Sequence, residues 1–253
     1  YQQHYLGILK DKIMLKIDLH IHTIASGHAY NTILEYINRA QELKMKIIGF
    51  SEHGPAVPGS INEVYFKCLD RLPRYVDGVM ILRGAEANIL DRKGTLDISD
   101  KTIKNKLDYV IAQFHKNTGW EDAGIEVNTA TLIKTIKSGK INIISHPYRH
   151  DKFPLNVKKI SEEATKNNVL LEINFHYILD NKIKDTIISD LKIMVETVKK
   201  YKKKILLGSD AHNIWELGDD SALKKIKKEI GLTDNLIINN YPKELLKLLK
   251  INV

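Results

Sequence analysis

Seven apolar runs of strand length recur along this chain, with helical patterns between them. The runs occupy residues 13–21, 46–51, 79–85, 107–114, 141–145, 169–174 and 205–209. Strands and helices in regular alternation predict parallel strands joined by crossover helices. Seven such units favour an α/β barrel of the (β/α)7 type over the alternative, an open doubly wound sheet. The sequence has no Gly-x-Gly-x-x-Gly motif and no Gly-Lys-Ser/Thr phosphate loop that would support a nucleotide-binding sheet.

The helical patterns show apolar residues at three-to-four spacing, which marks one buried face. In the first pattern, Ile33, Ile37 and Ala40 have this spacing. The patterns lie at residues 32–44, 130–137, 157–167, 185–201, 221–230 and 242–250. They supply the crossover helices that a parallel sheet requires.

Length and composition indicate one large domain. The chain has 253 residues, of which 43% are hydrophobic, enough for a single core. We expect the domain to span residues 14–253 and residues 1–13, which precede the first methionine, to form an N-terminal extension. The single cysteine, Cys68, excludes an intramolecular disulfide and a thiolate metal cluster, and we expect a cytoplasmic protein. No apolar run is long enough to cross a membrane.

The net charge of +8 raises the question of nucleic-acid binding. The lysines are concentrated in helical patterns, at residues 199–204 and 224–228. Such runs are typical of the solvated outer faces of helices. We therefore interpret the charge as a composition bias rather than a nucleic-acid surface.

Histidines and carboxylates follow the ends of the predicted strands. Asp18, His20 and His22 are two apart, so they share one face of the first strand. The sixth strand differs, since it carries Glu172 and is followed by His176. The other candidates in or after the strand ends are His28, His53, Glu86, His115, His146, Asp210 and His212. Because barrel sites are built at the carboxyl ends of the strands, the sequence predicts a metal site there.

The ligand types narrow the choice of metal. Seven imidazoles and two carboxylates without sulfur suit Zn²⁺, Mn²⁺ or Fe²⁺. A catalytic zinc ion usually takes three protein ligands. Nine candidates therefore indicate two or three ions, and a carboxylate such as Glu86 can bridge two of them.

Five strand-end motifs resemble the PHP family, named for polymerase and histidinol phosphatase. They are Asp-Leu-His-Ile-His-Thr at 18–23, Glu-His-Gly-Pro at 52–55, Leu-Arg-Gly-Ala-Glu-Ala-Asn-Ile at 82–89, Ile-Ser-His-Pro at 144–147 and Gly-Ser-Asp-Ala-His at 208–212. Within the family, Ala-Ser-Gly-His-Ala-Tyr at 25–30 is similar to the YcdX-like phosphatase subgroup. The resemblance implies a distorted (β/α)7 TIM-like barrel with a trinuclear metal site, often zinc, at the carboxyl ends of the strands.

The resemblance also implies how nine ligands divide among three ions. The first ion would take His20, His22, Glu86 and Asp210. The second would take Glu86, His115 and His146, and the third would take His28, His53 and His212. Two segments depart from the subgroup, Tyr-Arg-His at 148–150 and Phe-His-Tyr at 175–177, and we expect them to alter the pocket rim.

The function that the resemblance implies is hydrolysis of small phosphate monoesters by a metal-activated hydroxide. Three divalent ions in a small pocket would attract a dianionic phosphate. Catalytic roles are expected for Glu86, Asp210 and His212, the last as one of two candidate proton donors to the leaving oxygen. Residues that hold a ligand in place or contact the substrate are expected among Asp18, Lys116, Arg149, Glu172 and His176.

Three alternatives stay open. A phosphodiesterase or exonuclease would act on nucleic-acid ends or nucleotides. A metal-dependent amidohydrolase would share the His-x-His strand, although His28 has no place in that plan. A non-catalytic module would have lost ligands, which the filled set argues against. The sequence leaves the physiological substrate, the metal identity and the oligomeric state undecided, a homo-oligomer included.

Overall fold

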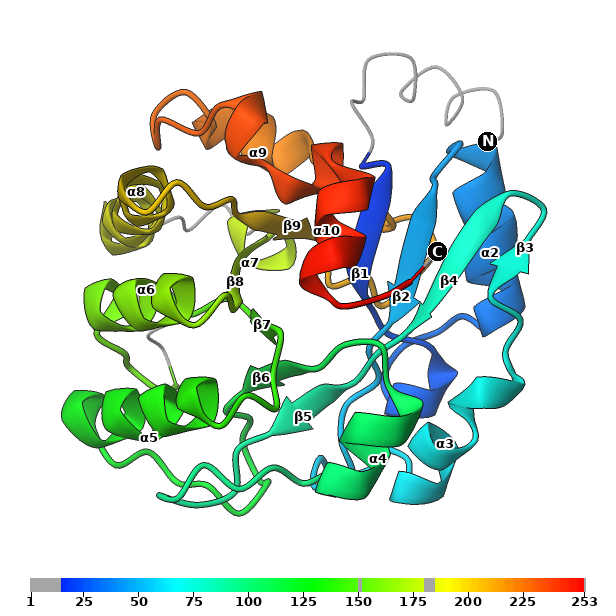
Figure 1. Cartoon of the computed structure of the whole chain (residues 1–253), viewed down its shortest axis with the longest axis horizontal. Helices are drawn as coiled ribbons and strands as arrows, with labels where there is room; N and C mark the ends of the chain where they lie inside the picture. Colours follow the sequence, from blue (N-terminus) through cyan, green and yellow to red (C-terminus); the bar gives the residue numbers. More distant parts are fainter. Residues whose placement is uncertain (1–14, 150–151, 180–184, 253) are drawn as a thin grey trace.

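Parallel strands form two sheets in the computed structural model, which describes residues 15–149, 152–179 and 185–252 (Figure 1). The sheet orders are β1-β2-β4-β3 and β5-β6-β7-β8-β9. Within the described residues, every strand pair is parallel except β3 with β4. The strands are β1 (Ile17–Ile21), β2 (Ile47–Phe50), β3 (Tyr75–Val76), β4 (Val79–Arg83), β5 (Glu86–Asn88), β6 (Ile111–Gln113), β7 (Ile143–Ile144), β8 (Leu170–Asn174) and β9 (Leu206–Gly208). The predicted α/β class is confirmed, and the predicted extension at 1–13 lies outside the described residues.

The two sheets meet beyond the carboxyl ends of β1, β2 and β9 and at the start of β5. β4 passes into β5 across a short break that contains Gly84. Isolated bridges pair Ile21 with Ala211 and His53 with Glu86. Within the part of the chain that is described, no continuous ladder closes the sheets into one ring, so the barrel stays a prediction.

Helices cover the outer sides of both sheets (Figure 1). α5, α6 and α8 pack in sequence beside the second sheet, and α2 packs against β2 and β4. The helices are α2 (Ile33–Glu42), α3 (Glu63–Lys67), α4 (Asp100–Lys106), α5 (Ile125–Lys137), α6 (Val157–Lys166), α7 (His176–Leu179), α8 (Asp185–Lys200), α9 (Ser221–Ile226) and α10 (Pro242–Leu248). None of the helices in these described ranges could span a membrane.

The predicted helices are present, with two changes of boundary. α5 begins at Ile125, before the pattern expected at 130–137, because Gly124 at φ 82° starts the helix. α9 ends at Ile226, inside the pattern expected at 221–230. α2 begins where expected, since the Thr32 side chain accepts from the Glu35 N–H and the Glu35 carboxylate accepts from the Thr32 N–H.

A smaller apolar cluster packs α10 against both sheets, apart from the larger core under the outer helices. Its members from the strands and from α10 are Ile17, Leu19, Ile47, Met80, Leu82, Ile111, Ile143, Leu170, Leu206, Leu245 and Leu246. Because strands of both sheets contribute to this one cluster, their carboxyl ends are held in a fixed arrangement. That arrangement positions the strand-end side chains.

Tyr109 packs against Gly49 in β2 and Gly84 after β4, and this contact gives a prediction about stability. Its hydroxyl donates to the Leu19 carbonyl at 2.6 Å. A Cβ at Gly49 or Gly84 would overlap the Tyr109 ring. Gly84→Ala is therefore expected to lower the free energy of unfolding by about 1–3 kcal/mol, the usual cost of overpacking. Urea denaturation measures the change.

The control for Gly84→Ala is the same substitution in a Tyr109→Leu background. The smaller side chain leaves room for the new methyl group, so the cost is expected to fall. An equal cost in both backgrounds would show that the overlap with Tyr109 is not the cause.

Candidate metal centre

All nine candidate ligands lie in one cluster at the carboxyl ends of the strands. His20 and His22 come from the end of β1, and Glu86 begins β5. The rest follow strands or the short helix η2 (Ile24–Ser26). A cavity of about 450 Å³ opens onto seven of the nine, namely His28, His53, Glu86, His115, His146, Asp210 and His212. His20 and His22 are fully buried beside it.

Glu86 stands at the centre of the cluster and faces histidines with both oxygens. Oε1 lies 3.6 Å from Nε2 of His115 and 3.8 Å from Nε2 of His146. Oε2 lies 3.5 Å from the Nε2 atoms of both His20 and His22. A carboxylate with imidazoles at both oxygens has the geometry needed to hold two cations.

Asp210 approaches the first of these groups from the other end of the chain. Its Oδ1 lies 3.1 Å from Nε2 of His22 and 3.4 Å from Nε2 of His20. Asp210 has a φ of 55°, a conformation that few residues other than glycine adopt. Its carboxylate thus completes a four-residue group with His20, His22 and Glu86.

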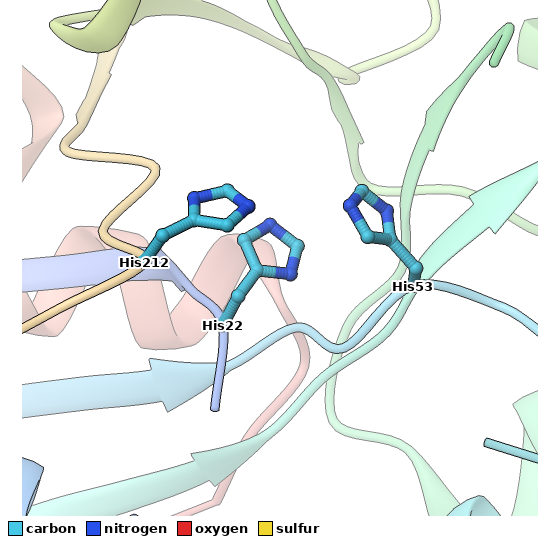
Figure 2. A group of neighbouring side chains, drawn as sticks. All are labelled: His22, His53 and His212. Carbon is cyan, nitrogen blue, oxygen red and sulfur yellow. The ribbon is translucent and has the colours of Figure 1, made fainter. Parts of the chain in front are cut away.

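His22, His53 and His212 form a second set of neighbours (Figure 2). The three side chains come from the segments that follow β1, β2 and β9, and the His22 ring lies close to the other two. His28 joins them, since its Nε2 lies 3.0 Å from Nε2 of His212 and its ring stacks on His53 at 5.0 Å. Imidazoles at these distances cannot all be protonated, because their charges repel.

Three groups bring their ligand atoms within 4.8 Å of one another. They are His20 with His22 and Asp210, His53 with Glu86 and His115, and His22 with His53 and His212. The first contains three of the four residues predicted for the first ion and lacks Glu86. The second joins His53, whose Nδ1 lies 2.9 Å from Oε2 of Glu86, to two residues predicted for the second ion. The third has His22 where His28 was predicted.

The Nδ1 atoms of five of the histidines face acceptors. These contacts are His20 to Glu172 at 2.8 Å, His22 to Ser26 at 3.0 Å, His28 to the Ser26 carbonyl at 3.1 Å, His115 to Asn88 at 2.7 Å and His212 to the Asp210 carbonyl at 2.8 Å. An acceptor at Nδ1 fixes the proton there. Each Nε2 is then left with a lone pair that can bind a cation.

Several of these nitrogens make no hydrogen bond among the described residues, because the carboxylate oxygens near them lie outside hydrogen-bond geometry. They are Nε2 of His20, Nε2 of His22 and Nδ1 of His53, all buried. A buried polar atom without a partner is costly, whereas a cation would satisfy all three. The donor set therefore fits divalent metal ions.

The protonation states of these side chains also favour metal binding. Burial lowers the pKa of His115 to about 4 and that of His146 to about 3, so both rings are neutral near pH 7. Burial opposes ionisation of Glu86, yet the neighbouring imidazole of His20 above all holds the Glu86 pKa well below its usual value. The centre thus combines neutral imidazoles at His115 and His146 with an ionised carboxylate at Glu86.

The outer candidates divide into supporting and cavity residues. Asp18 accepts from the backbone N–H groups of His20 at 3.2 Å and Ser209 at 3.3 Å, so it holds the strands rather than an imidazole ring. Burial raises the Asp18 pKa to about 6, against the hydrogen bonds that lower it. Glu172 instead contacts the His20 ring directly. The candidates that line the cavity are Lys116, Arg149 and His176.

Sequence reasoning did not identify the residues that support His22 and His115. Ser26 accepts from His22 and donates to Glu52 at 2.6 Å, and Glu52 also accepts from Thr23. Glu52 precedes His53 at a strand end, a position that could have marked it. Asn88 follows Glu86 by two residues, so the strand period places it on the same face.

The fold and the cluster define the class of protein, an α/β protein with a histidine–carboxylate centre able to hold metal ions. The comparisons then identify the family. The chain belongs to the PHP domain family, because the sequence model of that family matches residues 18–176. A second family model, described as RNase P subunit p30, matches residues 126–248.

Curated relatives carry the name probable phosphatase. One from Clostridium botulinum strain Hall is 38% identical over 234 residues, 92% of this chain and 94% of the relative. Relatives from Clostridium acetobutylicum and Clostridium novyi are 36% and 37% identical over the same shares. The names agree with the phosphatase branch that the motifs indicated.

Solved structures show the same fold at low identity. A histidinol phosphate phosphatase from Lactococcus lactis, complexed with zinc, L-histidinol and phosphate, is 16% identical with a TM-score of 0.58 and covers 87% of this chain and 95% of its own. An archaeal ribonuclease P with mature tRNA is 16% identical with a TM-score of 0.56. The match covers 92% of this chain and 88% of that structure's chain. Both likenesses concern the fold alone.

Proposed function

We propose that this protein is a metal-dependent phosphatase that hydrolyses phosphate monoesters with three divalent ions, zinc foremost among them. The observation that carries the proposal is Glu86, which faces imidazoles with both oxygens inside a cavity of about 450 Å³. Curated relatives named probable phosphatases, three of them 36%, 37% and 38% identical, support the reaction class. The zinc in the Lactococcus lactis phosphatase supports the metal.

We assign the ions as the family resemblance implies. His20, His22, Glu86 and Asp210 would hold the first, Glu86 with His115 and His146 the second, and His28 with His53 and His212 the third. The ions, when bound, supply the positive charge that activates water and neutralises phosphate oxygens. We further infer that residues 14–253 form one domain and that the two sheets form a distorted seven-stranded barrel.

His212 was a candidate both as a ligand and as a proton donor. Its Nδ1 faces the Asp210 carbonyl at 2.8 Å, and its Nε2 faces Nε2 of His28 at 3.0 Å. Only Nε2 is directed at the other ligands, so His212 cannot bind an ion and donate a proton at once. The contact with His28 favours the ligand role.

Cationic side chains would hold the substrate phosphate. Lys116 and Arg149 line the cavity, and the Arg149 guanidinium lies 4.4 Å above the Tyr177 ring. Tyr177 in turn packs edge-on against His146 at 4.7 Å. This stack directs Arg149 along the wall of the cavity, where planar guanidinium donors match phosphate oxygens. His176 lines the same wall and is proposed to contact the leaving group.

The test is a panel of substrates with added zinc or manganese. We expect hydrolysis of small phosphate monoesters to exceed that of phosphodiesters, amides and lactones. Elemental analysis of the same preparation should find more than two ions per chain. Preferential amide or lactone hydrolysis would support the amidohydrolase alternative and contradict the proposal.

The second candidate is a phosphodiesterase or exonuclease. The match of residues 126–248 to RNase P subunit p30 is the observation that favours testing it. Release of nucleotides from single-stranded DNA or RNA ends, faster than release of phosphate from small monoesters, would make it the better assignment.

A further inference from the structure

The histidine that follows the carboxyl end of β6, His115, is held through a chain of two polar side chains. Its Nδ1 lies 2.7 Å from Oδ1 of Asn88, which is fully buried. The other end of that amide, Nδ2 of Asn88, donates to Oδ2 of Asp97. Asp97 lies in the loop after β5 and is linked to His115 through Asn88.

Asp97 acts as an acceptor in this position. Its Oδ1 receives the backbone N–H of Asn88 at 2.8 Å, and its Oδ2 receives that of Ala56 at 3.0 Å. A carboxylate that already accepts two backbone N–H groups accepts the side-chain amide as well. The NH₂ group of Asn88 must therefore point at Asp97.

The orientation of the amide then decides the proton position on the imidazole. With its NH₂ group toward Asp97, Asn88 presents its carbonyl oxygen to His115. A carbonyl oxygen accepts only, so the His115 proton must sit on Nδ1. Nε2 keeps its lone pair, and it is Nε2 that lies 3.6 Å from Glu86.

The absence of a side chain at Gly54 leaves room for this arrangement. A Cβ at Gly54 would overlap the Asp97 carboxylate. The Gly54 N–H donates to the Glu86 carbonyl at 2.9 Å, so the loop after β2 lies directly over the start of β5. The glycine of the Glu-His-Gly-Pro motif thus allows a carboxylate from a later loop to reach Asn88.

We propose that Asp97 is a positioning residue that fixes the Nδ1–H tautomer of His115 through Asn88 and so prepares Nε2 to bind a metal ion. The metal part of this inference rests on the proposed function. The tautomer part does not, because it concerns the protein without metal.

The primary test is Asp97→Asn, examined in metal-free protein with ¹⁵N-labelled histidine. In the unaltered protein, long-range ¹H–¹⁵N spectra should show His115 protonated at Nδ1, with its signals assigned by their loss in His115→Ala. The amide introduced by Asp97→Asn can present a donor or an acceptor, so Asn88 can turn over and the Nε2–H tautomer should become populated. The affinity for zinc, measured by competition with a chelator, should fall about 10–100-fold.

The matched control is Asp91→Asn, the same change in the same loop. Asp91 accepts from Lys93 and Thr95 rather than from Asn88. This variant should keep both the Nδ1–H tautomer and the zinc affinity.

An exchange of the two side chains gives a rescue test. In the double variant Asn88→Asp with Asp97→Asn, the carboxylate accepts from His115 and from the new amide. The double variant should therefore restore the Nδ1–H tautomer of His115 and most of the zinc affinity. Should Asp97→Asn alone fail to fold, a folded double variant with this tautomer would still support the proposal.

Two results would overturn the inference. One is an unchanged His115 tautomer in Asp97→Asn, whatever the zinc affinity. That result would mean that Asp97 has only a structural role. The other is Nε2–H as the main tautomer of the unaltered protein. A protein with the expected tautomers that binds zinc but does not hydrolyse phosphate esters would contradict the proposed function alone.

Discussion

Glu86→Gln is expected to lower the turnover of a phosphate monoester at least about a thousandfold, which corresponds to ~4 kcal/mol of transition-state stabilisation. The carboxylate faces His115 and His146 with one oxygen and His20 and His22 with the other. Glutamine has the same shape but is neutral, and its amide places a donor where one of these oxygens was. It therefore cannot hold cations on both sides, and the bound metal content should fall with the activity.

Steady-state kinetics and elemental analysis on the same preparation check this result. The control is Glu35→Gln, because a glutamine at that position of α2 still serves the capping box with Thr32. His20→Ala should have the same effect as Glu86→Gln, since it removes a buried ligand and leaves Glu172 without its histidine partner. Full activity in a variant that has lost its metal would refute the proposed mechanism.

Removal of the metal ions is expected to abolish activity and to destabilise the folded protein. Without cations, the ionised Glu86 and Asp210 carboxylates and the partnerless nitrogens of His20 and His22 are buried together. A ligand at a thousand times its dissociation constant stabilises the folded state by about 4 kcal/mol. For a chain of this size, that corresponds to a fall in Tm on the order of 10 °C on metal removal.

Thermal unfolding before and after chelation measures this fall, and added zinc should restore both Tm and activity. In Glu86→Gln, chelation should lower Tm by much less, because less metal is bound at the start. An unchanged Tm of the unaltered protein after complete chelation would mean that the cluster does not bind ions tightly.

Much of the fold and of the cluster could be predicted because the relevant patterns are local. Apolar runs and three-to-four spacing depend on neighbouring residues, and they predicted the parallel α/β class. The strand period placed His20 and His22 on one face, and the structure shows both directed at Glu86. The YcdX-like resemblance indicated a phosphatase, in agreement with the names of the relatives.

Other features depend on contacts between distant segments, and the sequence did not reveal them. The break between β4 and β5 is located at Gly84, against which Tyr109 packs. Asp18 was expected to orient a histidine ring, whereas it binds backbone N–H groups of β1 and of the segment after β9. Asp97 follows no strand directly and has no motif of its own, so nothing local marked it.

The sequence by itself determined which residue types stand at the ends of the strands, because a period of two and a run of apolar residues are properties of a single segment. Only the tertiary structure decided which of those residues share a carboxylate oxygen, and which nitrogen each imidazole directs inward. Glu86 faces His115 with one oxygen and His22 with the other because β5 is the edge strand of the second sheet and Glu86 is bridged there to His53, which follows β2 of the first sheet. Hydrogen bonds from other strands and loops set the tautomers, and those bonds exist only once the chain has folded.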